Sequence, residues 1–218
     1  MKLKICGLKE LANTKMVASL KGVSYMGLIF APSPRQVSCK LGSQLASIIQ
    51  AEGKKAVGVF VDEADELILK KARFLNAVQI YKDISLELYE ALKALNLEVW
   101  QVCRVKSEAG FLAGRATKFQ AKAQAGQGGL NLSSQPHADL VLFDTAGKLA
   151  GGNGISFNWD LLKAYKQPFA LAGGIGVHNI KAAKELKPAI IDVNSKIEDE
   201  RGLKERAKIE FIIKELGL

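Results

Sequence analysis

The sequence predicts one compact α/β domain, a single (β/α)8 TIM barrel spanning residues 1–218. Short runs of apolar, largely β-branched residues alternate with stretches in which apolar residues recur at helical spacing. The runs are apolar on both faces, as in parallel strands that are covered on both sides. Eight strand–helix units fit into the 218 residues, and an open doubly wound sheet usually has fewer strands. A closed (β/α)8 barrel typically has about 250 residues, so this one is compact.

The predicted strands and helices alternate along the chain, except in the stretch after the fifth strand. The strands are expected at residues 2–6, 25–30, 56–61, 77–81, 98–104, 139–144, 168–172 and 189–193. The helices are expected at residues 8–20, 44–51, 67–75, 86–95, 158–165, 177–186 and 203–216. The stretch 107–129 follows neither pattern clearly. It is compatible with a helix over residues 113–125 and a long irregular loop around Gly126, Gly128 and Gly129.

Length and composition favour a single-domain cytoplasmic protein. Hydrophobic residues make up 48% of the chain and the mean hydropathy is +0.07, which suits one sizeable core. No apolar run reaches the roughly 18 residues that a membrane-spanning helix needs, and no long apolar stretch of a secretory signal stands at the start. We therefore expect a cytoplasmic location and no membrane partner.

The ionisable residues narrow the class of function. Cys6, Cys39 and Cys103 are widely spaced, which favours reduced thiols over disulfides. His137 and His178 lack the spacing of metal ligands, so no metal is expected. The net charge of +9 is compatible with nucleic acid, an anionic small molecule or solvated lysine-rich helix faces. Because the charges are spread out, with no basic tail or basic–aromatic alternation, we expect no nucleic-acid partner.

Polar side chains stand at or just past the ends of the predicted strands, where a barrel carries its chemistry. They are Cys6, Asp62, Gln79, Arg104, Asp144 and Asp192. Turns alone require fewer polar groups than this. Cys6 is then either a reactive thiol or a buried spacer. Asp144 is either a carboxyl group whose pKa is raised by desolvation, so that it keeps a proton for donation, or an aspartate that bonds its own turn.

Glycine-rich loops after the last strands predict an anion site. The loops are Gly151-Gly152-Asn153-Gly154, Gly173-Gly174-Ile175-Gly176 and Asn194-Ser195. Glycine lets backbone N–H groups approach an anion, and barrels often bind phosphate after strands seven and eight. We favour a phosphate site over plain turns. Arg35 could hold a carboxylate with two parallel hydrogen bonds, although a solvated first-turn arginine is the simpler interpretation of that residue alone.

Six motifs stand in order along the whole chain. They are residues 4–8 around Cys6, 27–35 ending at Arg35, 57–61 with 78–80, 143–144 with 151–159, 171–175 with Asn179, and 192–198 with 202–204. Together they resemble the motifs of the phosphoribosylanthranilate isomerase family. The resemblance implies a barrel that rearranges N-(5'-phosphoribosyl)anthranilate into 1-(2-carboxyphenylamino)-1-deoxyribulose 5-phosphate in tryptophan biosynthesis, with no cofactor. Its partner would be this small phosphorylated substrate.

The resemblance also implies a role for each candidate residue. Asp144 matches the general acid, which protonates the furanose ring oxygen. Cys6 matches the general base, which removes the C2 proton of the resulting iminium. Arg35 would hold the anthranilate carboxylate, and Asp192 would bond a ribulose hydroxyl. The phosphate would lie against Gly152, Gly154, Gly173, Gly174 and Ser195.

Lys4 and three departures from the family pattern qualify this assignment. If the first strand alternates, Lys4 points the same way as Cys6, and we hypothesise that it raises the thiolate population. Tyr81-Lys82 stand where many relatives have His-Gly, Asn153 replaces a threonine, and Lys196 replaces a glycine. These departures concern the loops more than the reaction.

Alternative functions remain open from the sequence. One is another phosphate-binding barrel enzyme of tryptophan or histidine biosynthesis. The indole-glycerol-phosphate synthase family relies on a catalytic lysine and glutamates, and the histidine-pathway isomerase has an aspartate where this chain has Cys6. Another is a non-catalytic anion-binding barrel, which we would expect to have lost Cys6 or Asp144. Either a monomer or a homodimer is compatible with the resemblance.

Overall fold

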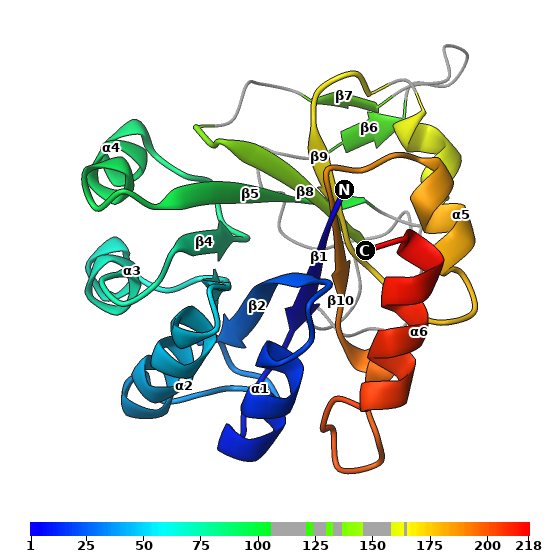
Figure 1. Cartoon of the computed structure of the whole chain (residues 1–218). Coiled ribbons are helices and arrows are strands. Elements are labelled where there is room, and N and C mark those ends of the chain that lie inside the picture. The colour runs from blue at the N-terminus through cyan, green and yellow to red at the C-terminus, as the bar shows by residue number, and fades with distance from the viewer. Residues whose placement is uncertain (106–120, 124–129, 133–136, 146–157, 164) are drawn as a thin grey trace.

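Eight parallel strands close into a barrel in the order β1-β10-β9-β8-β5-β4-β3-β2 (Figure 1). The computed structural model describes residues 1–105, 121–123, 130–132, 137–145, 158–163 and 165–218. The strands of the barrel are β1 (Lys2–Cys6), β2 (Val23–Ile29), β3 (Lys55–Phe60), β4 (Ala77–Ile80), β5 (Glu98–Val105), β8 (Leu140–Thr145), β9 (Phe169–Leu171) and β10 (Ile190–Val193). The predicted barrel is confirmed, and the strand ends differ from the predicted ones by one or two residues at most.

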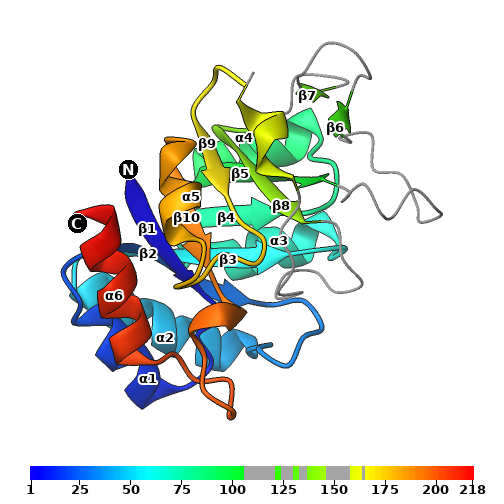
Figure 2. The ribbon, with the colours of Figure 1, turned by 90° about the vertical axis from the view of Figure 1, so that its right-hand side faces the viewer.

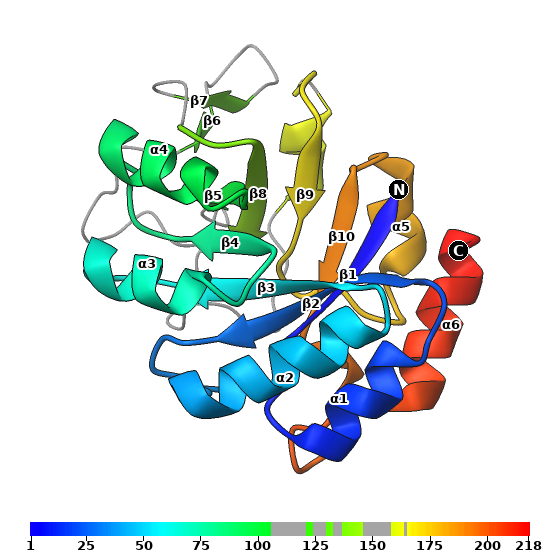
Figure 3. The same cartoon turned by 60° about the vertical axis from the view of Figure 1, so that its left-hand side comes forward.

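The helices lie outside the strands (Figures 1 and 3). They are α1 (Leu11–Ala18), α2 (Cys39–Ala51), α3 (Asp65–Ala72), α4 (Leu86–Ala94), α5 (Ile180–Glu185) and α6 (Arg206–Leu216), with short 3-10 helices η1 (Trp159–Leu162) and η2 (Ser195–Ile197). The two chain ends lie close together, at the start of β1 and the end of α6 (Figure 2). Of the described helices, none has the length and apolar character needed to cross a membrane.

Capping residues explain where the first two helices depart from their predicted limits. The α1 helix begins at Leu11, later than predicted, because the Glu10 side chain accepts hydrogen bonds from the amides of Ala12 and Asn13. The α2 helix begins at Cys39, earlier than predicted, because the Ser38 hydroxyl accepts one from the amide of Leu41. The α5 and α6 helices also start later than predicted, at Ile180 and Arg206.

Two helix predictions were wrong in type. In the predicted helix 158–165, the described residues 158–163 and 165 contain the 3-10 helix η1 and no α-helix, and the first turn of η1 is capped by the Asn158 side chain. Residues 121–123 form strand β6 (Ala121–Ala123), which pairs antiparallel with β7 (Leu130–Leu132) and therefore cannot be helical (Figure 2). The rest of the predicted helix over 113–125 lies outside the described residues.

Alternation along the strands separates two apolar clusters. Leu3 and Ile5 belong to the large cluster between the strands and the helices. Cys6 and Tyr81 belong instead to the cluster inside the barrel. Lys4 shares the face of Cys6, because side chains two residues apart on a strand point the same way. The side chain of Cys6, at the end of β1, therefore lies on the inner face of the barrel, at its mouth.

Candidate active site

A pocket opens at the carboxyl ends of the strands and gathers most of the predicted residues. Its lining consists of Cys6, Ile29, Val59, Gln79, Tyr81, Asp144, Ala172, Gly173, Gly174, Ile175, Asp192, Asn194 and Ser195. The predicted meeting of Cys6, Gln79, Asp144 and Asp192 at one mouth is therefore confirmed. Asp62 and Arg104 do not belong to this lining: Asp62 is exposed, and the Arg104 guanidinium lies over the Tyr81 ring.

Lys4 lies fully buried behind Cys6, inside the barrel. Its Nζ donates to Gln79 Oε1 at 2.9 Å and to Asp192 Oδ2 at 2.7 Å. The ion pair with Asp192 joins neighbouring strands, since Lys4 and Asp192 stand side by side in the β1–β10 register. Lys4 therefore places a positive charge beneath the thiol, on the side predicted from the alternation of β1.

Two effects raise the pKa of the Cys6 thiol, and two neighbouring lysines lower it. Burial raises it most, and the charge of Asp192 raises it further. Lys4 and Lys204 lower it through their positive charges. The net pKa lies above the ordinary value of a thiol. Lys4 lowers the pKa of Cys6, as hypothesised, but the effect of burial is larger. The thiol form of Cys6 therefore predominates at neutral pH.

Asp144, one residue before the end of β8, is a buried carboxyl group with two described hydrogen-bond donors. Its Oδ2 accepts from the Tyr81 hydroxyl at 2.7 Å, and its Oδ1 accepts from the Thr145 amide at 2.8 Å. Burial raises the pKa of Asp144 to about 6, against the lowering effect of Tyr81, the Thr145 amide and Arg104, while Asp192 raises it. A raised pKa was predicted for this position. The carboxyl group can thus carry a transferable proton not far from neutral pH.

Asp192 offers the pocket an acceptor that is not satisfied by the described residues. Its Oδ2 is paired with Lys4, whereas its Oδ1 is buried and has no hydrogen-bond partner among them. Burial raises the pKa of this carboxyl group, and the charges of Lys4 and Lys204 lower it. A buried acceptor without a hydrogen bond costs free energy. The Oδ1 atom of Asp192 can therefore accept a hydrogen bond from a hydroxyl group of a ligand.

The loop after β9 is shaped by Gly173 and Gly174. Gly173 has φ +90° and Gly174 φ +66°, both in the left-handed region that favours glycine. A Cβ atom on Gly173 would lie 2.3 Å from Thr145 Oγ1, so a larger residue does not fit. Asn179 fixes the loop, since its Oδ1 accepts from the Gly176 amide and its Nδ2 donates to the Gly174 carbonyl.

This loop and the start of η2 face the pocket together. Within the described part of the chain, the amides of Gly174 and Ile175 make no hydrogen bond, and Ser195 begins η2 beside them in the pocket lining. Such amides suit an anion. Gly152 and Gly154, the other predicted phosphate ligands, lie outside the described residues.

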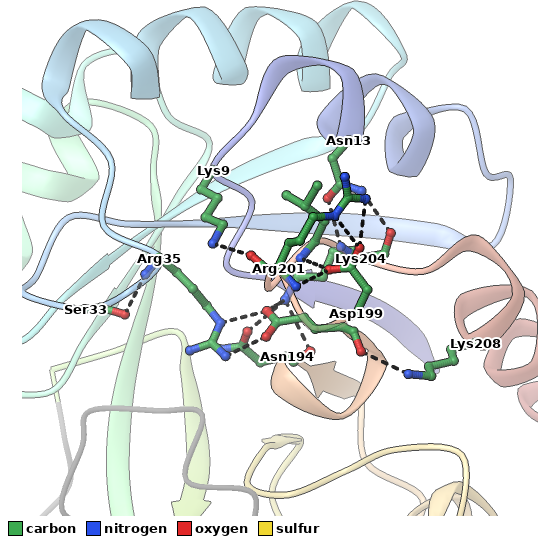
Figure 4. Close-up of polar contacts among 11 residues, drawn as sticks. Lys9, Asn13, Ser33, Arg35, Asn194, Asp199, Arg201, Lys204 and Lys208 are labelled. Atoms are coloured by element: carbon green, nitrogen blue, oxygen red, sulfur yellow. Dashed lines mark hydrogen bonds and ion pairs between the residues drawn. The ribbon is translucent and has the colours of Figure 1, made fainter.

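Arg35 is held by an ion pair. Its Nε and Nη2 donate to the two carboxylate oxygens of Glu198 at 2.7 and 2.6 Å, and Lys204 Nζ donates to the same carboxylate at 2.5 Å (Figure 4). Lys204 also donates to Asn194 Oδ1 at 2.9 Å (Figure 4). With a side-chain exposure of 14%, Arg35 is not the solvated first-turn arginine that the sequence also allowed.

The Arg35–Glu198–Lys204 cluster carries a surplus positive charge beside Cys6. A Cβ atom on Gly7, the residue after Cys6, would lie 2.6 Å from Arg35 Cδ, so this arginine packs directly on the β1 loop. Lys204 has no exposed side-chain surface, and burial lowers its pKa to about 8. Two cations share one carboxylate when Lys204 is charged, which leaves one positive charge for a ligand carboxylate.

Sequence reasoning did not assign Tyr81, Glu198 or Lys204 to the site. The only available signal was their position in or beside family-like motifs, and Tyr81 appeared there as a departure from the pattern. Among the described residues there is no group of three or more His, Cys, Asp or Glu side chains arranged to hold a metal ion.

The chain is similar to curated proteins along its whole length. The family model for N-(5'phosphoribosyl)anthranilate (PRA) isomerase matches residues 3–215. The N-(5'-phosphoribosyl)anthranilate isomerase of Campylobacter jejuni is 45% identical over 218 residues, covering 99% of this chain and 98% of that protein. The tryptophan biosynthesis protein TrpCF of Helicobacter pylori is 34% identical, covering 94% of this chain and 42% of that protein.

Solved structures of the same name share the fold. The phosphoribosyl anthranilate isomerase of Thermotoga maritima has a TM-score of 0.73 and 25% identity, with 100% of both chains covered. Another phosphoribosyl anthranilate isomerase, in complex with reduced 1-(o-carboxyphenylamino)-1-deoxyribulose 5-phosphate, has a TM-score of 0.69 and 24% identity, again with 100% of both chains covered.

Proposed function

Because the chain belongs to the N-(5'-phosphoribosyl)anthranilate isomerase family, we propose that its barrel mouth performs that reaction with Asp144 as general acid and Cys6 as general base. The chain is an isomerase of tryptophan biosynthesis that converts an aminoaldose into an aminoketose. The observation that best supports the two roles is that both side chains line one pocket, with Asp144 buried at its wall.

The two residues act in sequence on neighbouring atoms of the sugar. Asp144 gives its proton to the furanose ring oxygen, and the C1–O bond breaks as the nitrogen lone pair forms the iminium. The Cys6 thiolate then takes the proton from C2, which the adjacent iminium has made acidic. The electron pair of that C–H bond neutralises the iminium and yields an enol-enamine. Tautomerisation of this intermediate gives the ketone, so no external oxidant or reductant is required.

The two pKa shifts determine the expected pH dependence. Asp144 loses its proton at about pH 6, and Cys6 loses its proton only above the ordinary range of a thiol. The reactive form, with Asp144 protonated and Cys6 ionised, is therefore a minority species whose share is constant between the two pKa values. We expect a bell-shaped profile of kcat/KM with an acidic limb near pH 6, set by Asp144.

We assign the two anionic groups of the substrate to two separate parts of the site. The phosphate would lie against Gly173, Gly174 and Ser195 in the pocket lining, where the amides of Gly174 and Ile175 make no hydrogen bond to described residues. Gly152 and Gly154 remain proposed contacts outside the described residues. A related protein of this name binds a reduced form of the phosphorylated product, which supports a ligand of this class.

The carboxylate and a sugar hydroxyl would occupy the remaining groups. The anthranilate carboxylate would meet the surplus positive charge of Arg35 and Lys204. The Asp192 Oδ1 atom would accept a hydrogen bond from a ribulose hydroxyl. Absence of a nucleic-acid partner, a cytoplasmic location and a monomer or homodimer remain predictions. The alternative barrel enzymes and the non-catalytic barrel lose their support, since the whole chain matches the isomerase family.

The proposed roles can be tested by following the anthranilate fluorescence as freshly generated substrate is consumed. Cys6→Ser and Asp144→Asn should each lower kcat by about 10²- to 10⁴-fold with the fold intact. Cys39→Ser and Asp62→Asn are matched controls on exposed residues and should keep wild-type turnover. Near-wild-type turnover in either test variant would refute the role of that residue.

A further inference from the structure

Tyr81 is a buried tyrosine at the mouth whose hydroxyl contacts the general acid. It directly follows β4, is 6% exposed, and lies in the pocket lining. Its hydroxyl is 2.7 Å from Asp144 Oδ2. The guanidinium carbon of Arg104 lies 4.9 Å from the centre of its ring, within the range of a cation–π contact.

The backbone on both sides of Tyr81 is fixed. The Gln101 side chain donates to the carbonyl of Ile80 at 3.2 Å and to that of Lys82 at 3.0 Å. Lys82 in turn donates to the Glu63 carbonyl at 2.6 Å. The Tyr81 amide donates to the Phe60 carbonyl at 3.0 Å, which ties this residue to β3. A phenol held in this way offers its proton at one defined place.

We propose that Tyr81 is the positioning residue of Asp144: its hydroxyl orients the carboxyl group and stabilises the carboxylate that remains after proton transfer to the substrate. This inference rests on the proposed function, in which Asp144 is the acid. The negative charge on Asp144 develops as the ring oxygen takes the proton. A hydrogen bond that strengthens with this charge favours the transition state over the ground state in which Asp144 is protonated.

The chemistry of a phenol suits this role across the working pH range. Burial and the charge of Asp144 hold the pKa of Tyr81 well above its ordinary value, so the hydroxyl stays a donor throughout. An imidazole in the same place would change its charge near pH 6.5. The other charged or titratable groups that act on Asp144 and Tyr81 are Arg104 from β5, Asp192 from β10 and Cys6 from β1. Tyr81 is the one among these groups that donates directly to Asp144.

The test is Tyr81→Phe, which removes the hydroxyl oxygen and leaves the ring. We expect the acidic limb of kcat/KM to move up by about one pH unit, because the carboxylate loses a donor that stabilised it. We also expect kcat below about pH 6, where Asp144 starts protonated, to fall about tenfold with little change in KM, whereas the plateau above this limb should stay nearly unchanged. Tyr89→Phe is the matched control, since the Tyr89 hydroxyl donates to Asp139 at 3.0 Å, at the opposite end of β8. An acidic limb of Tyr81→Phe at the wild-type position would overturn the proposal.

A readout that needs no turnover separates this proposal from the function on which it rests. Carbon NMR of the Asp144 carboxyl group should show its titration shifted upward in Tyr81→Phe and unchanged in Tyr89→Phe. Lack of turnover in the wild type would contradict the proposed function without altering this result. If Tyr81→Phe does not fold, the Tyr81 Cζ signal of the wild type should still follow the titration of Asp144 near pH 6. A Cζ signal that stays constant from about pH 5 to 8 would contradict the hydrogen bond.

Discussion

Two aspartates, Asp139 and Asp144, lie near opposite ends of β8, and their pKa values are shifted in opposite directions. Asp139, just before β8, accepts from Lys93 at 2.7 Å, from the Val99 amide at 2.9 Å and from the Tyr89 hydroxyl at 3.0 Å. Burial alone would raise its pKa, but Lys93 and the two other donors outweigh this and lower it. Asp144 also accepts from a tyrosine and an amide, yet its pKa is raised to about 6 by burial.

The difference between the two ends of β8 lies in solvent and in the nearest cation. Asp139 is exposed and forms an ion pair with a lysine. Asp144 is 5% exposed, and its described hydrogen-bond donors are neutral. The amino end of the strand therefore uses its carboxylate to join β8 to β5 and α4, whereas the carboxyl end keeps a carboxyl group that can hold a proton. This agrees with the division of barrels into a stabilising face and a catalytic face.

The largest expected effect separates these two aspartates. Asp144→Asn should reduce kcat by about 10²- to 10⁴-fold, whereas Asp139→Asn should leave kcat within about twofold. At pH 8 the free energies of unfolding of the two variants should change in opposite directions. Asp144 is charged at this pH, and its buried site in the folded protein disfavours the charged form. Asp144→Asn should raise the free energy of unfolding by up to about 3 kcal/mol, and Asp139→Asn should lower it by about 1–3 kcal/mol. Denaturant unfolding checks both.

The same pair predicts two opposite pH dependences of stability. The raised pKa of Asp144 contributes stability below its unfolded pKa, and this is lost as the pH rises through about 6. The lowered pKa of Asp139 contributes stability above its unfolded pKa, and this is lost as the pH falls through its folded pKa. Equal pH dependence of the two variants relative to wild type would contradict the comparison.

Gly173→Ala should have the next largest effect. Its Cβ atom would lie 2.3 Å from Thr145 Oγ1 and 3.1 Å from Asp144 Oδ1, and φ is +90°. We expect a loss of about 1–3 kcal/mol of stability and a large rise in KM, since the loop facing the pocket must move. Gly53→Ala has a similar positive φ with nothing within 4 Å of the new atom, so it should show the backbone cost alone. Equal KM in both variants would argue against an anion site at Gly173.

Lys4→Met tests the charge beneath the thiol. Lys4 lowers the pKa of Cys6, so its removal should raise that pKa and move the alkaline limb of kcat/KM upward by about one unit. Turnover at neutral pH should fall about tenfold, because the thiolate becomes rarer. Lys2→Met, on the same strand but exposed, is the control. An unchanged pH–rate profile in Lys4→Met would contradict the hypothesis that Lys4 raises the thiolate population of Cys6.

The smallest expected effect concerns the Arg35 cluster. Glu198→Gln removes the charge that Arg35 and Lys204 share, so Arg35 should lose its fixed orientation. We expect KM to rise about tenfold with kcat nearly unchanged, because a binding contact and not the chemistry is disturbed. Arg201→Gln, in the same connection but paired at the surface with Asp199, should behave as wild type. A fall in kcat alone would place Glu198 in a different role.

The sequence predicted what depends on local pattern. Strands that are apolar on both faces and polar at their carboxyl ends led to the barrel, and from there to Cys6, Asp144 and Asp192 at one mouth. The limits of α1 and α2 were missed because a side-chain cap outweighs hydrophobic periodicity, as Glu10 and Ser38 show. Residues 121–123 were missed because strand pairing overrides helix-compatible local sequence.

Contacts between distant residues could not be predicted. Arg35 and Glu198 are 163 positions apart, and only the closed barrel brings them together. In the sequence, Tyr81 stood out only as a departure from the family pattern, which by itself assigns it no role in the site. Its contact with Asp144, 63 positions away, depends on the register of β4, β5 and β8. The pKa of Cys6 likewise depends on the balance of burial and two lysines, which no sequence pattern gives.

The central claim is that the barrel mouth keeps Asp144 as a proton-bearing acid while Asp139 serves as a structural carboxylate. Carbon NMR of both carboxyl groups in the wild-type protein, titrated from about pH 2 to 9, tests this directly. The account predicts a pKa of about 6 for Asp144 and a pKa below the ordinary aspartate value for Asp139. An Asp144 carboxyl group that titrates at or below the ordinary aspartate value would contradict it.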